Sequence, residues 1–330
     1  MPTLYLAQDG VRVQREGEQL VARLDGDEAA RVPLEWLDLV VLQGTCHLTQ
    51  PALLACLARG VPVAYLSPGG EFLGRLEPPA PRVARVQRAQ LRFCEDGPAC
   101  LALAQTVVHA KLRNAHTVLR RSARGAEGEA ALARIAAAAA GTGRAGDLDA
   151  LRGWEGAGAA AYFQAWVAGL EAQWGFAGRR YRPAPDPVNA ALNFVYALLR
   201  SRIAGAIAAA GLNPYLGFFH ADREGHATLA SDMMEEWRPA VADRVVLAAI
   251  EDGLLRLEHA DLTPEGDHRL GMENRRALIA LWERKLEERI TLPCSGTPGP
   301  LRAAFLQQVL HLSRHMQAPA DEPYQPWRVR

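Results

Sequence analysis

The chain has 330 residues, enough for about two domains, and its 49% hydrophobic and 22% charged residues form an ordinary globular balance. No apolar stretch is long enough to span a membrane and the N-terminus has no secretory pattern, so the sequence predicts a cytoplasmic protein. The 37 basic and 37 acidic residues cancel, which argues mildly against nucleic acid but leaves room for a local basic patch.

The cysteine and lysine content indicates which kinds of binding site the chain could contain. Five cysteines, an odd number, lie at positions 46, 56, 94, 100 and 294 without any C-x-x-C pair, so we expect buried free thiols rather than disulfides or a zinc site. Only two of the 37 basic residues are lysine, Lys111 and Lys285. The rest are arginine, which suits bidentate phosphate contacts, although a GC-rich coding bias explains most of this preference.

Residues 1–80 read as a small β domain. Short apolar runs alternate with turn signals such as Asp25-Gly26, a pattern that predicts strands and hairpins. One helix is expected from residue 49 to residue 59, because Pro51 favours the first turn and Gly60 ends it. The proline-rich stretch at 77–81 interrupts both helix and sheet and therefore predicts the domain boundary.

After residue 81 the apolar pattern changes to the period of about 3.6 that is typical of helices. Helices are expected over residues 83–94, 99–124, 126–140, 147–172, 187–210, 231–251, 272–288 and 299–316. The last residues, roughly fifteen in number and rich in proline, predict a loosely ordered tail. This order of elements predicts an α+β fold, with a small β-sandwich-like domain followed by a larger all-α catalytic domain over residues 81–330.

A glutamate flanked by glycines stands out in the first of three segments that could carry chemistry. Glu155 lies between Gly153 and Gly158 in an otherwise apolar helix that continues to Tyr162 and Phe163. The ordinary explanation is that an acidic side chain is favoured at a helix N-terminus. The alternative is a functional carboxylate in a buried helix.

The second segment delivers a histidine and the third begins with acidic residues. Residues 211–220 run from a helix end through an Asn-Pro turn to His220, which is either a hydrogen-bonded core residue or a metal ligand. Ser231 is a good helix N-cap and is followed by three acids that include Asp232 and Glu235. These two share one helix face, but acids in a first turn could also simply complement the helix dipole.

Together these side chains have the chemistry of a divalent-metal site. One imidazole and two or three carboxylates provide mostly oxygen ligands with one nitrogen, which suits Mg²⁺ or Mn²⁺ and tilts the preference toward Mn²⁺. A cation held in this way can polarise a phosphodiester, activate a hydroxyl group and stabilise the leaving oxygen. No spacing rule joins positions so far apart in the chain, so composition alone does not bring them together.

These segments resemble the CRISPR-associated protein one family, the spacer-acquisition endonuclease and integrase. Residues 211–220 fit the family's G-[LF]-[ND]-P-x-x-G-F-x-H segment, and residues 232–239 fit its D-[LM]-x-E-x-[FW]-R-P segment. Glu155 stands where the family carries a glutamate before an aromatic pair, and residues 186–190 look like its D-P-x-N-A helix start. The resemblance extends over nearly the whole chain.

The resemblance implies that Glu155, His220 and Glu235 are the catalytic residues and the ligands of Mg²⁺ or Mn²⁺, with Asp232 as a further candidate ligand. It implies a metal-dependent DNA endonuclease/integrase of antiviral defence, which inserts spacer DNA into a CRISPR array by attack of a prespacer 3′-hydroxyl on a repeat phosphodiester. It also implies homodimers formed mainly through the β domain. Two such dimers would flank a dimer of CRISPR-associated protein two in a heterohexamer.

Arginines supply candidate contacts for the phosphates of DNA. Arg179, Arg180 and Arg182 form a basic cluster before a proline-rich break, and Arg238 stands beside the carboxylates. The ordinary alternative is a solvated charged loop for the cluster and a helix salt bridge for Arg238.

Two other functions would use the same residues. In a non-enzymatic helical DNA-binding or scaffold protein, the acids only cap helices and His220 lies in the core. In an RNase or another metal-dependent phosphodiesterase, the ligands are the same and the substrate differs. A serine or cysteine hydrolase is disfavoured, because no G-x-S-x-G or comparable nucleophile pattern occurs.

Overall fold

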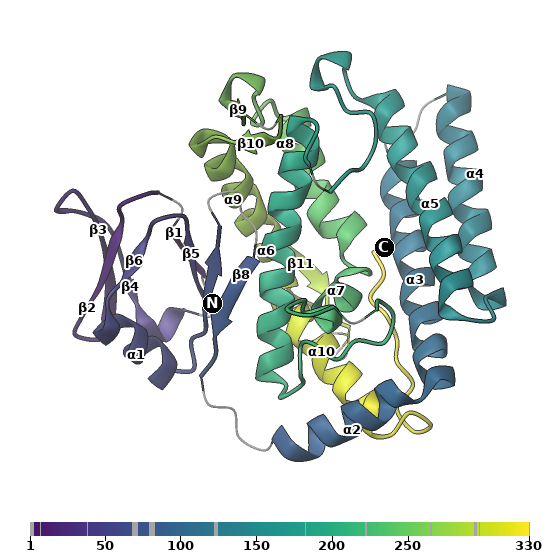
Figure 1. Cartoon of the computed structure of the whole chain (residues 1–330), viewed down its shortest axis with the longest axis horizontal. Helices are drawn as coiled ribbons and strands as arrows, with labels where there is room; N and C mark the ends of the chain where they lie inside the picture. Colours follow the sequence, from purple (N-terminus) through teal and green to yellow (C-terminus); the bar gives the residue numbers. More distant parts are fainter. Residues whose placement is uncertain are drawn as a thin grey trace.

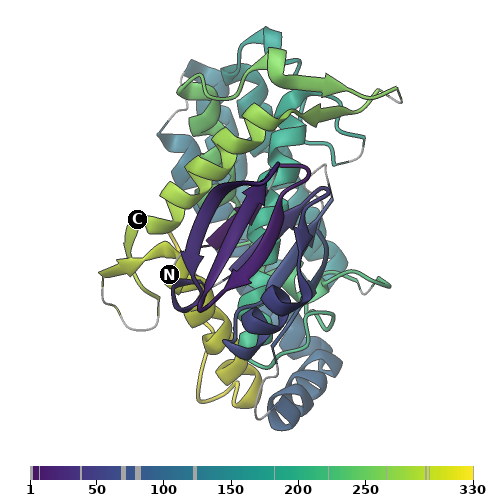
Figure 2. The ribbon, with the colours of Figure 1, turned by 90° about the vertical axis from the view of Figure 1, so that its left-hand side faces the viewer.

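The computed structural model describes residues 3–6, 8–37, 39–67, 72–78, 83–121, 125–181, 183–221, 223–264, 266–293, 296 and 298–329. Eight strands lie together at one end of the molecule, and helices make up most of the rest (Figure 1). Seen from the strand end, the helical part extends beyond the strands above and below (Figure 2).

No helix within the described ranges is both long and apolar enough to cross a bilayer. The described cysteines are free, namely Cys46, Cys56, Cys94 and Cys100, whereas Cys294 lies outside the described residues.

Two four-stranded sheets form the N-terminal part. The strands of the first sheet, in order across it, are β1 (Thr3–Leu6), β5 (Leu39–Gln43), β7 (Val63–Leu66) and β8 (Phe72–Leu76). Those of the second are β4 (Asp27–Pro33), β3 (Gln19–Leu24), β2 (Arg12–Glu16) and β6 (His47–Leu48). Both sheets share one apolar core with the helix α1 (Gln50–Ala58), which agrees with the predicted β-sandwich-like unit.

The predicted Asp-Gly turn joins β3 to β4. Asp25 has a φ of 52° and Gly26 a φ of 96°. Two consecutive positive φ angles are what a two-residue type I′ turn requires, and the Asp-Gly pair adopts them at low cost. The turn therefore sets the antiparallel register in which Leu24 pairs with Asp27.

Most helices of the C-terminal part agree with their predicted bounds to within about one turn. They are α2 (Val83–Glu95), α3 (Gly97–Arg120), α4 (Gly125–Gly141), α5 (Leu148–Gly169), α6 (Pro187–Ala209), α9 (Met272–Glu287) and α10 (Leu301–Gln317). An aspartate N-cap precedes each of α3, α5 and α6, where its carboxylate accepts the backbone N–H three residues later. These N-caps are Asp96, Asp147 and Asp186.

One face of the first sheet packs against these helices. Val41 and Leu66 are buried with the helical core, whereas Val40 faces the second sheet, as the two-residue alternation of a strand requires. Arg75 of β8 extends this contact, because its Nη1 donates a hydrogen bond to the Ser201 carbonyl oxygen of α6 over 2.8 Å. The strands are thereby fixed to the central helix of the C-terminal part.

The helices α3, α4 and α5 pack side by side at the end of the molecule opposite the strands (Figure 1). A Cβ atom at Gly158 of α5 would overlap the side chain of Leu112 on α3, so this glycine allows the two helices to approach closely. The close approach brings Glu155 of α5 next to Lys111 of α3.

Two features of the helical part differ from the prediction. The sequence does not predict two short antiparallel ribbons, because three-residue strands show no measurable alternation. These ribbons pair β9 (Ala260–Leu262) with β10 (His268–Leu270) and β11 (Arg289–Thr291) with β12 (Pro298–Pro300). The helix expected over residues 231–251 consists of α7 (Thr228–Met234), the π-helical η4 (Arg238–Asp243) and α8 (Arg244–Glu251). Pro239 lacks a backbone N–H and cannot continue the α-helical ladder, which accounts for the break.

The C-terminal segment, residues 318–329, is not the loosely ordered tail that the sequence predicts. Tyr324 and Trp327 are buried. The Tyr324 hydroxyl donates to Glu236 Oε1 over 2.8 Å, and the Trp327 backbone N–H donates to Glu236 Oε2 over 2.5 Å. The Trp327 ring also stacks on Trp237. The segment is held because it satisfies a buried carboxyl group and covers an aromatic side chain directly after α7.

Candidate functional site

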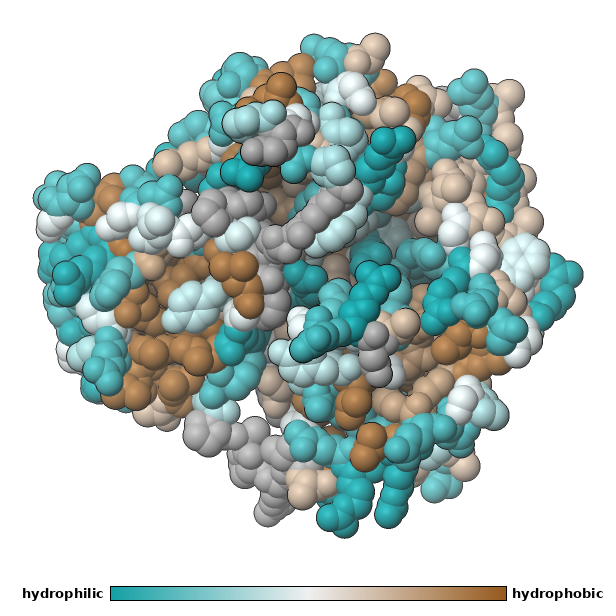
Figure 3. Space-filling view, viewed as in Figure 1, coloured by the Kyte–Doolittle hydropathy of each residue, from teal (hydrophilic) through white to brown (hydrophobic). Residues whose placement is uncertain are grey.

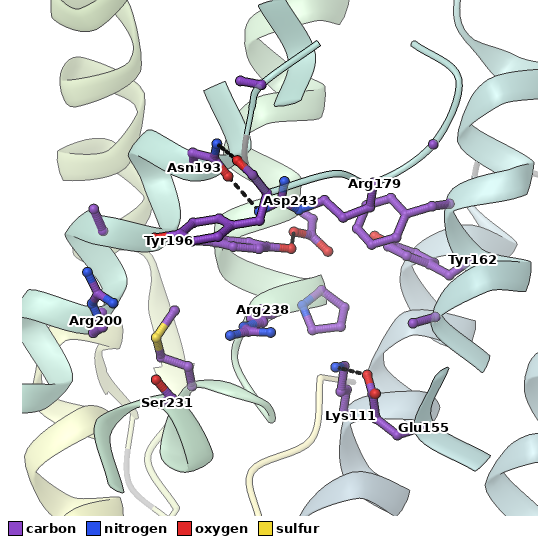
Figure 4. Close-up of a pocket in the computed structure, with 18 of the residues that line it drawn as sticks. Lys111, Glu155, Tyr162, Arg179, Asn193, Tyr196, Arg200, Ser231, Arg238 and Asp243 are labelled. Carbon is purple, nitrogen blue, oxygen red and sulfur yellow. Dashed lines mark hydrogen bonds and ion pairs between the residues drawn. The ribbon is translucent and has the colours of Figure 1, made fainter. Parts of the chain in front are cut away.

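A cavity of about 1620 Å³ opens in the helical part. Its wall includes side chains from α3, α5, α6 and η4, among them Lys111, Glu155, Tyr196, Arg238 and Asp243 (Figure 4). Hydrophilic side chains cover much of the middle of the molecular face seen in Figure 3. The volume exceeds the roughly 300–1,000 Å³ of a small-molecule pocket, so the cavity has room for part of a polymer.

Glu155 reaches the cavity from within α5. The helix begins at Leu148, so Glu155 lies beyond the first turn and the helix dipole does not explain its presence. Its carboxylate is partly exposed, and Oε1 forms a short ion pair with the ammonium group of Lys111. The residue is thus a carboxylate held by a cation at the cavity wall.

Glu235, which follows α7 directly, lies behind this wall and is 1% exposed. Its Oε1 lies 3.0 Å from Arg238 Nη1, and its Oε2 lies 2.5 Å from Lys111 Nζ. Burial raises the pKa of Glu235, but Arg238, Lys111 and His220 outweigh burial and lower this pKa to about 2. The carboxylate is therefore ionised at neutral pH although it is buried.

Lys111 joins the two glutamates and is a candidate that sequence reasoning missed. The residue is 8% exposed, and its Nζ contacts both Glu155 and Glu235. Burial lowers the pKa of Lys111, but the two carboxylates raise it above its ordinary value, so the ammonium group stays charged. The feature of the sequence that could have identified Lys111 is the rarity of lysine, since it is one of only two lysines in an arginine-rich chain.

Asp232 holds the loop that carries His220. Its Oδ2 accepts the backbone N–H groups of Phe218 and Phe219 over 2.7 and 3.0 Å. Its Oδ1 accepts the His220 backbone N–H over 3.1 Å and lies 2.5 Å from His220 Nδ1. The other ring nitrogen of His220, Nε2, lies 3.8 Å from Glu235 Oε1. The imidazole ring thus lies between the carboxylates of Asp232, within α7, and Glu235, at the C-terminal end of α7.

The helix that leads to these acids begins earlier than predicted. Its first residue is Thr228, and Ser231 lies inside it, where the Oγ atom is 2.9 Å from His226 Nε2. Ser231 is therefore not the N-cap, and Asp232 and Glu235 do not lie in the first turn. Because both acids lie beyond the first turn, the helix dipole explains neither of them. Asp232 instead accepts backbone N–H groups of residues 218–220, and Glu235 contacts Lys111 of α3.

A second polar cluster lines the cavity beside the glutamates (Figure 4). The Tyr196 hydroxyl donates to Asp243 Oδ1 over 2.7 Å. The guanidinium carbons of Arg179 and Arg238 lie 5.1 and 5.0 Å from the centre of the Tyr196 ring, within cation–π range. Burial raises the pKa of Asp243 to about 6, although Tyr196, Arg238 and Arg179 lower it. The cluster holds two guanidinium groups at the cavity.

The arginines that the sequence singles out divide between the cavity and the surface. Arg179 and Arg238 line the cavity, whereas Arg180 is exposed. Arg182 lies outside the described residues. Arg238 does form the salt bridge of the ordinary alternative, with Glu235, and it lines the cavity as well.

The donors gathered here have the composition that a hard divalent cation prefers, with carboxylate oxygens and one imidazole nitrogen. The Oε2 atom of Glu235 is buried and contacts the Lys111 ammonium group, and His220 Nε2 lies beyond hydrogen-bond distance of Glu235. In the described ranges no three His, Cys, Asp or Glu side chains form a ready group for a metal, and the Lys111 ammonium lies between Glu155 and Glu235. The residues fit such a cation in chemical type.

Sequence comparison relates this chain to known proteins. The family model described as CRISPR associated protein Cas1 matches residues 4–284. A CRISPR-associated endonuclease Cas1 of Thermus thermophilus is 39% identical, and the match covers 99% of this chain and all of that protein. A CRISPR-associated exonuclease Cas4/endonuclease Cas1 fusion of Rhodospirillum rubrum is 37% identical over 98% of this chain, which spans only 57% of the fusion.

Solved structures share the fold. A casposase bound to an integration product superposes with a TM-score of 0.85 at 21% identity, covering 100% of this chain and 96% of that one. A chain of a Cas6-RT-Cas1–Cas2 complex superposes with a TM-score of 0.86 at 25% identity, covering 100% of this chain and 36% of that one. Because the family model matches most of this chain and the Thermus thermophilus relative is 39% identical, the chain belongs to the CRISPR-associated protein Cas1 family.

Proposed function

We propose that this Cas1-family chain is a metal-dependent DNA endonuclease/integrase, which inserts spacer DNA into a CRISPR array by 3′-hydroxyl attack on a repeat phosphodiester. The observation that carries the proposal is the convergence of Glu155, His220 and Glu235 at one side of the cavity: Lys111 contacts both glutamates, and His220 Nε2 lies 3.8 Å from Glu235 Oε1. The curated relatives are named CRISPR-associated endonucleases, which supports the reaction class.

The proposed ligands of Mg²⁺ or Mn²⁺ are Glu155, His220 and Glu235. When bound, such a cation polarises a phosphodiester and favours attack by a hydroxyl group. His220 would bind through Nε2, because Nδ1 faces Asp232. Both oxygens of Asp232 already accept hydrogen bonds from the loop before it, which supports a positioning role for Asp232 and leaves Glu235 as the third ligand.

The proposed phosphate contacts are Arg179 and Arg238, because both residues line the cavity and Arg238 pairs with Glu235. A guanidinium group can donate two parallel hydrogen bonds to a phosphate. Arg180 is a proposed contact at the surface, and Arg182 is proposed from the sequence alone. Contacts of this kind bind the DNA backbone, so the choice of sequence would depend on DNA shape and on partners.

The site favours an enzyme over a non-enzymatic scaffold. In a scaffold the acids would cap helices, but Glu155 lies inside α5 and Glu235 follows the last turn of α7. Ionised carboxylates in a buried position cost stability, and such groups concentrate where binding or catalysis uses them. An RNA phosphodiesterase would use the same ligands, so the nature of the nucleic acid is settled by assay.

The proposal includes assembly. Large apolar side chains are exposed on the strand-bearing part, namely Trp36, Leu54 and Leu73, and an apolar patch lies over this part in Figure 3. Exposed apolar patches are typical of interfaces, which supports homodimers formed through this part. The similar chain of a solved Cas6-RT-Cas1–Cas2 complex supports CRISPR-associated protein two as a partner. The heterohexamer is proposed from the family resemblance alone. We propose the cytoplasm as the site of action, because the substrate is DNA.

A strand-transfer assay tests the proposed function. A short DNA duplex with 3′-hydroxyl ends is incubated with a repeat-bearing plasmid, the partner protein and Mn²⁺, with and without a chelator. We expect integration by the wild type and a loss of at least about 100-fold in Glu155→Ala, His220→Ala and Glu235→Ala, because each removes a metal ligand.

The control variant is Glu273→Ala, which removes an exposed acid on α9 and should integrate like the wild type. Circular dichroism confirms that each variant is folded. An RNA duplex in place of DNA tests the phosphodiesterase alternative. Strand transfer retained in all three site variants would remove this site from consideration.

A further inference from the structure

The ammonium group of Lys111 lies between the two glutamates of the proposed metal site. Its Nζ is 2.5 Å from Glu235 Oε2 and forms an ion pair with Glu155 Oε1. Arg238 pairs with the other oxygen of Glu235, Oε1, over 3.0 Å. The two carboxylate oxygens that Lys111 holds, one from each glutamate, are therefore atoms that a divalent cation between the glutamates would also need.

The choice of lysine at this position is informative. The chain uses arginine almost everywhere, and its other lysine, Lys285, forms an ordinary surface pair with Glu288 over 2.7 Å. Arginine presents a rigid planar fork, whereas lysine presents a compact charge on a flexible stem. A compact charge that can shift along its stem is suited to sharing carboxylates with a second cation.

We propose that Lys111 competes with the divalent cation for Glu155 and Glu235 and thereby sets the cation affinity of the site. This inference rests on the proposed function. Two cations a few ångströms apart in a buried site repel each other strongly. The divalent cation therefore binds only when Lys111 releases its contacts with Glu155 and Glu235.

The cavity offers Lys111 an alternative partner. Lys111 lines the cavity in which the phosphates of DNA would lie, next to Arg238. A phosphate drawn into the cavity would attract the ammonium group away from the glutamates and so free their oxygens. Binding of DNA and binding of the divalent cation would then strengthen each other, and by linkage the effect is reciprocal.

Titration of the full chain with Mn²⁺ tests the competition. Electron paramagnetic resonance measures free Mn²⁺ for the wild type, for Lys111→Met and for Lys285→Met. We expect Lys111→Met to bind Mn²⁺ at least about tenfold more tightly, because a competing positive charge is gone. Lys285→Met is the matched control and should bind like the wild type, because Lys285 contacts neither glutamate.

A DNA duplex added to the titration tests the coupling. It should tighten Mn²⁺ binding by the wild type at least about threefold and tighten binding by Lys111→Met less. If Lys111→Met does not fold, Lys111→Gln is the second neutral variant and carries the same expectation.

The outcomes separate this inference from the proposed function. A wild type that binds Mn²⁺ while the neutral variants bind it equally or more weakly would overturn the competition and leave the metal site standing. A wild type that neither binds Mn²⁺ nor transfers strands would overturn the proposed function itself, and this inference with it.

Discussion

At the scale of single residues, Asp232 shows how a buried carboxylate can orient another side chain. It is fully buried, and its two oxygens take three backbone N–H groups and face His220 Nδ1. A hydrogen bond at Nδ1 fixes the tautomer in which Nδ1 carries the proton and Nε2 keeps its lone pair. The imidazole is thereby oriented for its proposed role as a ligand, with Nε2 on the side that faces Glu235.

This role makes Asp232→Asn a specific test. The amide has one oxygen instead of two, so it cannot accept all of the hydrogen bonds, and His220 loses its fixed orientation. We expect Mn²⁺ affinity and strand transfer to fall by about 10- to 100-fold, as for other groups that orient a metal-bound histidine. Asp149→Asn on the exposed face of α5 is the control. Unchanged Mn²⁺ affinity in a folded Asp232→Asn protein would reduce Asp232 to a structural role.

How far each residue could be predicted depends on how local its signal is. Asp25 and Gly26 were predictable, because a type I′ turn depends only on its own two residues. Glu155 and Lys111 meet across two helices, and their contact depends on a close approach that no pattern in either helix reveals. Sequence motifs could therefore nominate Glu155, whereas the partner that holds it could be seen only in the folded chain.

At the scale of elements, the π-helical η4 has a direct effect on the cavity. Arg238 and Asp243 are its first and last residues, and both line the cavity. In an α-helix, residues five apart point about 140° from each other, because each residue turns the chain by about 100°. The wider π turn brings them to the same side. The uninterrupted helix expected from the sequence would have turned one of them away.

The C-terminal segment predicts a pH-dependent stability through Glu236. Burial raises the pKa of Glu236 to about 8 from an ordinary 4.5, although hydrogen bonds from Tyr324 and Trp327 lower it. Above the ordinary pKa the unfolded chain loses a proton that the folded chain retains. The contribution to stability is therefore fully present below the ordinary pKa and is lost as the pH rises through the folded pKa.

The variant Glu236→Gln isolates this effect, because its side chain does not ionise. Between about pH 6 and pH 8 we expect the free energy of unfolding of the wild type to fall more than that of the variant, by on the order of 1–3 kcal/mol. Urea unfolding at the two pH values measures the difference. Glu77 and Asp243, whose pKa values are also raised, affect both proteins alike. An equal fall in both proteins would show that Glu236 is already ionised in the folded state.

At the scale of the whole molecule, the charge is balanced and the basic groups matter by position. The net formal charge is zero, so the chain has no overall attraction for DNA. The cavity nevertheless gathers more basic than acidic side chains. Its basic lining residues are Lys111, Arg179, Arg200, Arg223, Arg238 and Arg269, whereas the acids are Glu155, Asp243, Asp267 and the buried Glu235 behind them. A divalent cation would add further positive charge, so DNA affinity should arise from this cavity rather than from the surface as a whole.

Arg179→Gln tests this view of the whole molecule. Each protein cation that contacts a phosphate contributes about 0.9 to the slope of log affinity against log salt for duplex DNA. We expect Arg179→Gln to weaken DNA binding and to reduce that slope by about one, measured by fluorescence anisotropy with a chelator present so that cation binding does not contribute. Arg284→Gln removes a mainly exposed charge on α9, paired with Asp252, and should leave the slope unchanged. Equal slopes for both variants would mean that DNA is bound by diffuse surface charge and not by this cavity.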